Sequence, residues 1–138
     1  MVLDTNVMLD VWLFGDARAA TLAQALGKGH LQHVATAAML EELRDVLGRP
    51  ALARWAARVP EAWAAITAHC AVVARPDAPD PALPRCEDPD DQMFIDLACC
   101  LRLPWLVSRD KAVLKLARAA RAWGVSVIQP FEWQAKHP

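Results

Sequence analysis

Short apolar segments without polar alternation recur along this chain, and helical segments separate them. A strand that is buried on both faces has such a continuous apolar sequence, which is typical of a parallel sheet covered by helices. Strands that alternate with helices are joined by right-handed crossovers. The pattern therefore predicts an α/β fold with a mainly parallel sheet of four or five strands, flanked by helices on both faces. The expected strands are Met1–Leu3, Leu31–Ala35, Ala71–Ala74, Trp105–Val107 and Val125–Ile128.

Helix signals fill the gaps between the expected strands. Thr36 is a suitable N-cap for a helix with a buried apolar face, and Gly48 and Pro50 end it. Asp110 is expected to open a long last helix that runs to about Trp123. The loop 75–90 is rich in Pro and Asp, and residues 130–138 are expected to form a tail. The other expected helices are about 16–26, 51–59, 60–70 and 90–101.

Length and composition predict one domain over residues 1–138. A hydrophobic fraction of 55% is enough for a real core. The net charge of -1 is not that of a protein that holds nucleic acid by electrostatics alone. If the substrate is a polyanion, local basic patches and metal ions are needed to attract it.

The four cysteines are best explained as free thiols in a reducing compartment, because two of them are adjacent in an apolar helical segment and none forms a Cys-x-x-Cys pair. No signal-peptide pattern opens the chain, and no apolar run is long enough to span a bilayer. We therefore expect a soluble cytoplasmic protein with no membrane partner.

Four acidic residues stand at the ends of apolar segments. Asp4 and Asp110 directly follow expected strands, where the functional crevice of a parallel sheet lies. Glu42 lies on an inner helix edge and Asp91 at a helix start. Converging carboxylates would raise each other's pKa unless a cation lay between them. The pattern predicts a divalent metal site, although Asp4 as a simple turn residue and Asp110 as a simple helix cap are the alternatives.

Two of these acids have neighbours that compete for the same position. Asp88 and Asp90 are alternatives to Asp91, and both suit a solvated loop or a helix cap. The spacing from Asp91 to the apolar residues of the following helix favours Asp91. Glu41 competes with Glu42, but Glu42 should lie nearer the buried face of its helix.

Carboxylate ligands select Mg²⁺ or Mn²⁺ rather than zinc. Such ions lower the pKa of a bound water and stabilise both oxygens of an in-line phosphoryl displacement. The chain contains no Gly-x-Ser-x-Gly elbow, no Walker loop and no Gly-x-Gly-x-x-Gly motif. Metal-dependent phosphodiester hydrolysis with water as the nucleophile is therefore the leading hypothesis.

Basic residues accompany the last acid. We predict that the face formed by Arg109, Lys111, Lys115 and Arg118 contacts substrate phosphates beside the metal. A solvated charge stripe is the alternative. A second, looser basic set has the same expected role, or binds a partner. It consists of Arg44, Arg49, Arg54 and Arg58.

Residues 2–7, 41–50, 88–98 and 106–114 together resemble the motifs of PIN-domain ribonucleases. The resemblance extends over nearly the whole chain, and the closest group is the VapC toxins of bacterial toxin–antitoxin pairs. It implies that Asp4, Asp91 and Asp110 hold the metal, and that Glu42 completes the pocket or orients a water. Two supporting polar residues are also implied, Asn6 and Ser108.

The same resemblance implies an RNA substrate, a small antitoxin protein as partner, and a homodimer. Two other functions stay open from the sequence. One is a metal-dependent phosphatase of small phosphoesters, which the modest net charge permits. The other is a PIN-like RNA-binding module that has lost its activity, although four intact acidic positions argue against it.

Overall fold

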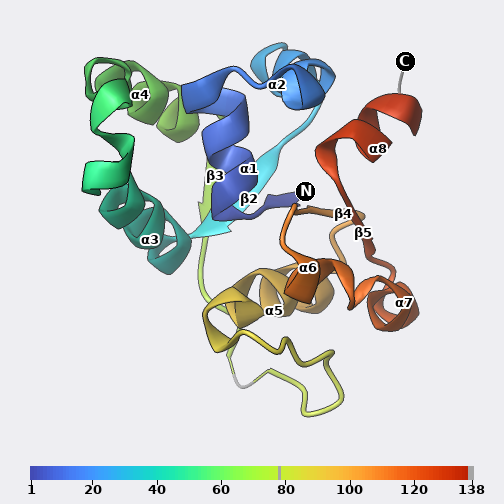
Figure 1. Cartoon of the computed structure of the whole chain (residues 1–138). Helices are drawn as coiled ribbons and strands as arrows, with labels where there is room; N and C mark the ends of the chain where they lie inside the picture. Colours follow the sequence, from blue (N-terminus) through green and yellow to red (C-terminus); the bar gives the residue numbers. More distant parts are fainter. Residues whose placement is uncertain (78, 137–138) are drawn as a thin grey trace.

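The computed structural model describes residues 1–77 and 79–136, and it confirms the α/β fold with parallel strands (Figure 1). The two sets of strands are β1-β4-β5 and β2-β3, and every pairing within them is parallel. The observed boundaries differ from the expected ones by two residues or fewer. The strands are β1 Val2–Leu3, β2 His33–Thr36, β3 Cys70–Val73, β4 Trp105–Val107 and β5 Ser126–Ile128.

Hydrogen bonds at the N-terminus place the two sets of strands side by side. The backbone amide of Val34 donates to the carbonyl oxygen of Met1 at 2.9 Å, and the N-terminal ammonium donates to the carbonyl of Gln32 at 2.9 Å. The spatial order is therefore β3-β2-β1-β4-β5. The chain leaves β1 toward β2 on one side and returns to β4 on the other, so the switch point between β1 and β4 is where a parallel sheet places its site.

Helices pack on both faces of these strands. Thr36 caps α3 as predicted, because its hydroxyl accepts a hydrogen bond from the Met39 amide at 3.4 Å. None of the helices in the described part of the chain is long and apolar enough to cross a membrane. The α-helices are α1 Thr5–Leu9, α2 Ala20–Gly27, α3 Ala37–Leu47, α4 Val59–His69, α5 Gln92–Cys100, α6 Lys111–Leu114, α7 Ala117–Ala120 and α8 Pro130–Lys136. A π-helix, η1 Asp10–Phe14, and the 3-10 segments η2 Ala17–Ala19, η3 Pro50–Arg58, η4 Pro89–Asp91 and η5 Arg121–Trp123 complete the set.

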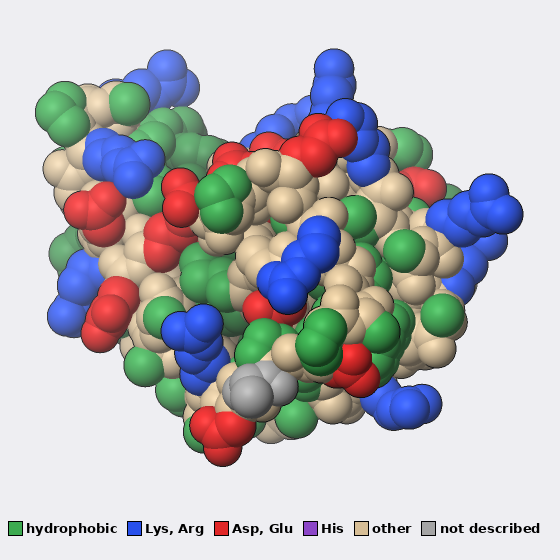
Figure 2. Space-filling model, turned by 90° about the horizontal axis from the view of Figure 1, so that it is seen from below, with side chains coloured by type: hydrophobic (Ala, Val, Ile, Leu, Met, Phe, Trp, Pro, Cys, Tyr) green, Lys and Arg blue, Asp and Glu red, His purple; other side chains and the backbone are tan. Residues whose placement is uncertain are grey.

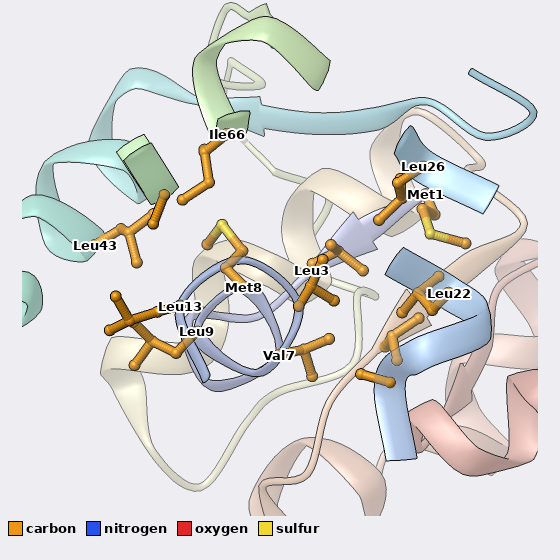
Figure 3. Close-up of a cluster of buried hydrophobic side chains, with 14 of the residues drawn as sticks. Met1, Leu3, Val7, Met8, Leu9, Leu13, Leu22, Leu26, Leu43 and Ile66 are labelled. Carbon is orange, nitrogen blue, oxygen red and sulfur yellow. The ribbon is translucent and has the colours of Figure 1, made fainter. Parts of the chain in front are cut away.

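The core has two halves because successive strand residues point to opposite faces. Leu3 packs with side chains of α1, α2 and α4, where Met8, Leu22 and Ile66 surround it (Figure 3). Val2 packs on the other face, with α5, α6 and α7. Both residues of β1 are fully buried. A strand of only two residues is thus held by both halves of the core, and this fixes the position of Asp4, which follows it.

The expectation of one long helix from Asp110 to about Trp123 is wrong. The segment is divided into α6, α7 and η5. The amide of Leu116 bonds to the carbonyl of Val113 at 3.0 Å, a bond between residues three apart that tightens the chain and interrupts the α-helix. Similarly, the helix expected at 51–59 is the 3-10 segment η3.

The expectation that residues 130–138 form a tail is also wrong, because Pro130–Lys136 forms α8. Pro130 occupies the first turn, and the Glu132 carboxylate accepts a hydrogen bond from the Gln129 amide at 2.7 Å, so that a capping-box contact starts the helix. Trp133 is 3% exposed and belongs to the core. Residues 137 and 138 of the expected tail lie outside the described residues. The four cysteines are free, as expected.

Candidate active site

Asp4 lies at the carboxyl end of β1 and is the N-cap of α1. One of its carboxylate oxygens accepts a hydrogen bond from the Val7 amide at 2.9 Å, and the other accepts one from the Ser108 hydroxyl. The residue is 3% exposed. Burial raises the pKa of the Asp4 carboxyl to about 6, although the hydrogen bonds from Ser108 and Val7 oppose the rise. Asp4 is therefore a costly buried acid, which a cap alone does not require.

Ser108 joins the first acid to the last one. Its hydroxyl donates to Asp4 and accepts a hydrogen bond from the backbone amide of Asp110 at 2.9 Å. Asp110 caps α6, since its carboxylate accepts from the Ala112 amide at 2.7 Å. The pairing of β1 with β4 brings these residues together across more than a hundred positions of sequence. Ser108 thus has contacts that fit its predicted supporting role, whereas Asn6 is exposed on α1.

The local backbone distinguishes Asp88 from Asp91. Asp88 precedes the 3-10 segment η4, and its carboxylate accepts a hydrogen bond from the Asp90 amide at 3.0 Å. Asp88 is therefore the cap. Asp91 makes no capping bond at the start of α5 and is only partly exposed. Its carboxylate is left available for a ligand.

Electrostatics connect all four acids. The pKa of the Asp91 carboxyl is raised to about 6, first by burial and then by the negative charges of Asp110, Asp88, Asp4 and Glu42. Solvent and salt screen charges that lie far apart, so an effect of these charges on the pKa of Asp91 means that the carboxylates are close to one another. The structure therefore brings the predicted quartet to one place at the carboxyl ends of β1 and β4. The catalytic roles of its members stay predictions.

Glu42 reaches this place from α3. Its carboxylate accepts a hydrogen bond from the hydroxyl of Thr5 at 2.6 Å, and Thr5 directly follows Asp4 in the chain. Glu42 is half-buried, while Glu41 is exposed. The geometry therefore favours Glu42 of the two glutamates as the member of the site.

A cleft of about 670 Å³ opens beside Glu42. It adjoins the acids, because the Cys86 thiol in its wall has a pKa raised first by burial and also by Asp91 and Asp110. Figure 2 shows the molecule from below, the side of the 75–90 loop in Figure 1, where basic, acidic and apolar side chains are mixed. The lining residues are Thr36, Ala38, Glu42, Arg75, Pro76, Pro79, Arg85, Cys86, Pro89, Asp90, Gln92, Met93 and Asp96.

Arg109 has an internal partner. Its guanidinium pairs with the carboxylate of Asp10, with Nε at 2.5 Å and Nη2 at 3.0 Å. Asp10 lies in η1 and its side chain is 3% exposed, against 33% for Arg109. Burial raises the pKa of Asp10, and Arg109 opposes the rise. The pair fastens the segment after β4 to η1. Sequence reasoning missed it, although an isolated acid in the apolar stretch 7–14 was a signal.

The other predicted substrate contacts are exposed on α6, α7 and the turn between them. Lys115 pairs with exposed Glu87 of the loop at 2.9 Å, a surface contact of small energy. Lys111 and Arg118 have exposed side chains on the same segment. Contact of these three residues, or of Arg109, with substrate stays a prediction.

The donor set fits a hard divalent cation. The clustered groups are carboxylates, and two of them have a pKa near 6 because burial and their neighbours disfavour the charged forms. A cation at this place would reverse both effects. Within the described ranges 1–77 and 79–136, no three His, Cys, Asp or Glu residues form a ready-made metal cage. Mg²⁺ does not need one, since it keeps several waters and binds one or two carboxylates plus substrate phosphate.

A parallel α/β fold with clustered acids at its switch point is suited to binding a divalent cation. The profile of the PIN domain matches residues 1–112, and the chain belongs to the PIN-domain family. PIN domains are generally nucleases. Neither a curated protein nor a solved structure gave a significant match.

Proposed function

We propose that this PIN domain is an endoribonuclease that depends on Mg²⁺ or Mn²⁺ and hydrolyses phosphodiester bonds of RNA with water. The observation that carries the proposal is the convergence of acids at the carboxyl ends of β1 and β4, where Ser108 bonds to both Asp4 and Asp110 and the Thr5 hydroxyl bonds to Glu42. The raised pKa of Asp91 agrees with it. These acids come from four separate parts of the sequence and meet where a parallel sheet places its site. Mutual repulsion among these carboxylates destabilises the fold unless the site binds a positively charged ligand.

Each acid has a stated role in this proposal. Asp4, Asp91 and Asp110 would hold the cation directly or through its waters, and the hydrogen bonds to Asp4 and Asp110 orient those carboxylates. When bound, a divalent ion would supply a water of lowered pKa and would neutralise charge that develops on the phosphoryl oxygens. Glu42, fixed by the Thr5 hydroxyl, orients the attacking water or accepts its proton.

The biological setting is proposed from the sequence resemblance. We assign the protein the role of a toxin that a small antitoxin protein neutralises, and we expect a homodimer. A cytoplasmic location agrees with the four free thiols.

The test compares neighbouring residues on the same elements. We expect Asp91→Asn to lower RNA cleavage by more than about 100-fold, because loss of a ligand should exceed the 10–100-fold effect of an outer-shell partner. Glu42→Gln should reduce the rate strongly, whereas Glu41→Gln, exposed on the same helix, should leave it unchanged. Wild-type activity should vanish in excess EDTA and return with Mn²⁺ or Mg²⁺.

Three results would overturn the proposal. The first is full activity of Asp91→Asn with the fold intact by circular dichroism. The second is cleavage that continues in excess EDTA. The third is rapid hydrolysis of a small phosphomonoester with no action on RNA, which would make the protein a phosphatase.

A further inference from the structure

The cleft beside Glu42 contains two arginines that the sequence interpretation did not single out. Arg75 follows β3, Arg85 lies near the end of the 75–90 loop, and both line the cleft. Both side chains are exposed. Within the described part of the chain neither arginine has an ion-pair partner, in contrast to Arg109 and Lys115. The two guanidinium groups are therefore free to bind an anion next to the acidic quartet.

The backbone around Arg85 is fixed by Gln92 of α5. The side-chain amide nitrogen of Gln92 donates to the carbonyl of Pro84 at 2.9 Å, and its amide oxygen accepts from the Cys86 amide at 2.7 Å. The residues before and after Arg85 are thus both tied to the helix that begins at the acidic site. The same amide nitrogen also donates to Asp96 at 2.8 Å, which fixes the Gln92 side chain. Arg85 is consequently placed by a rigid element in spite of its loop position.

The walls of the cleft combine three kinds of group. Prolines and Met93 offer apolar surface, the Asp96 carboxylate offers a polar contact, and the arginines lie at the loop side. A volume of about 670 Å³ is within the usual range for a small-molecule ligand and is ample for one nucleotide. Proteins bind single-stranded RNA by placing an unstacked base on apolar or guanidinium planes. Polar groups then form hydrogen bonds with the edge of that base.

We propose that this cleft is the binding site for a nucleotide next to the scissile phosphate, with Arg75 and Arg85 on the RNA phosphates and an unstacked base between the loop and α5. The proposal rests on the proposed function and adds the cleft residues that position the RNA strand beside the acids. A base in a duplex remains paired and stacked, so it cannot enter the cleft. The strand would then extend from the cleft across Glu42 to the acids at the ends of β1 and β4.

Binding is measured with a labelled single-stranded RNA oligonucleotide in the Asp91→Asn background, so that no cleavage occurs. Arg75→Ala and Arg85→Ala should each weaken binding about tenfold, the usual effect of losing one charge-assisted hydrogen bond. The slope of log K against log salt should become shallower by about 0.7 for each lost phosphate contact. Arg85→Lys should keep most of the slope because it keeps the charge. A duplex of the same sequence should bind much more weakly.

Arg121→Ala is the matched control, since this exposed arginine lies in η5, before the start of β5 and therefore at the opposite end of the strands from the cleft. It should change neither affinity nor slope. Salt slopes that stay unchanged in both cleft variants would overturn the inference, as would equal binding of single strand and duplex. The proposed function has its own test: if the cleft variants bind normally while Asp91→Asn and EDTA still abolish cleavage, only the cleft assignment fails. If Asp91→Asn cleaves RNA normally, the nuclease mechanism itself fails.

Discussion

Asp4→Asn should make the metal-free protein more stable at alkaline pH. The pKa of Asp4 is about 6 in the folded protein, against an ordinary value of 3.8 for an aspartate in the unfolded chain. The difference of about 2.2 units corresponds to about 3 kcal/mol at 1.36 kcal/mol per unit. Between those two pKa values the folded state binds the extra proton, so stability falls as pH rises from about 4 to about 6 and then stays level. Asparagine cannot ionise and avoids this cost.

The hydrogen bonds around Asp4 are compatible with asparagine. Its side-chain oxygen can accept from the Val7 amide, and its amide nitrogen can donate to the hydroxyl of Ser108 in the reversed direction. We therefore expect Asp4→Asn to exceed the wild type at pH 8 in EDTA by up to about 3 kcal/mol. In a chain of this size that is roughly 10 °C in melting temperature. The gain should disappear near pH 4, where the wild-type carboxyl is protonated.

Urea and thermal unfolding at pH 4 and pH 8, with EDTA and with Mn²⁺, measure the effect. Asp45→Asn is the control, because Asp45 has an exposed side chain and its change should shift stability by less than about 1 kcal/mol. Mn²⁺ should stabilise the wild type at pH 8 more than the Asp4 variant. The reasoning is refuted if Asp4→Asn is no more stable than the wild type at pH 8, or if its advantage is the same at pH 4.

Two further predictions follow from the contacts around the site. Ser108→Ala removes a hydrogen bond that lowers the pKa of Asp4, so the acid limb of the pH–activity profile should move to higher pH. Ser108→Thr keeps the hydroxyl and should keep the wild-type profile. An acid limb that does not move in the Ala variant would contradict this. Arg109→Ala leaves the Asp10 carboxylate buried without its partner and should cost about 3 kcal/mol, the low end for a buried pair, because the guanidinium is partly exposed. In urea unfolding, adding Asp10→Asn to that variant should restore stability, and a further loss would show that the carboxylate is not the cause.

Local sequence predicted much of the fold. Continuous apolar segments indicated the strands, and Thr36 indicated the start of α3 through its own hydroxyl. The positions of Asp4 and Asp110 near strand ends were visible for the same reason, since Asp4 follows β1 directly and Asp110 lies three residues after the end of β4. The predictions of one long last helix and of a C-terminal tail were wrong in part. The tail did contain a local signal, Pro130 with Glu132 two residues later, which fits the capping contact that starts α8.

What the sequence by itself determined is the order of elements and the acids at their ends, because both follow from residues that are neighbours in the chain. Only the tertiary structure decided which charges meet. The pairing of Asp10 with Arg109 and the bond from Ser108 to Asp4 join residues about a hundred positions apart. Such contacts depend on β4 lying beside β1. They pair Arg109 with Asp10. Arg75 and Arg85 instead line the cleft, and no local pattern specifies this difference.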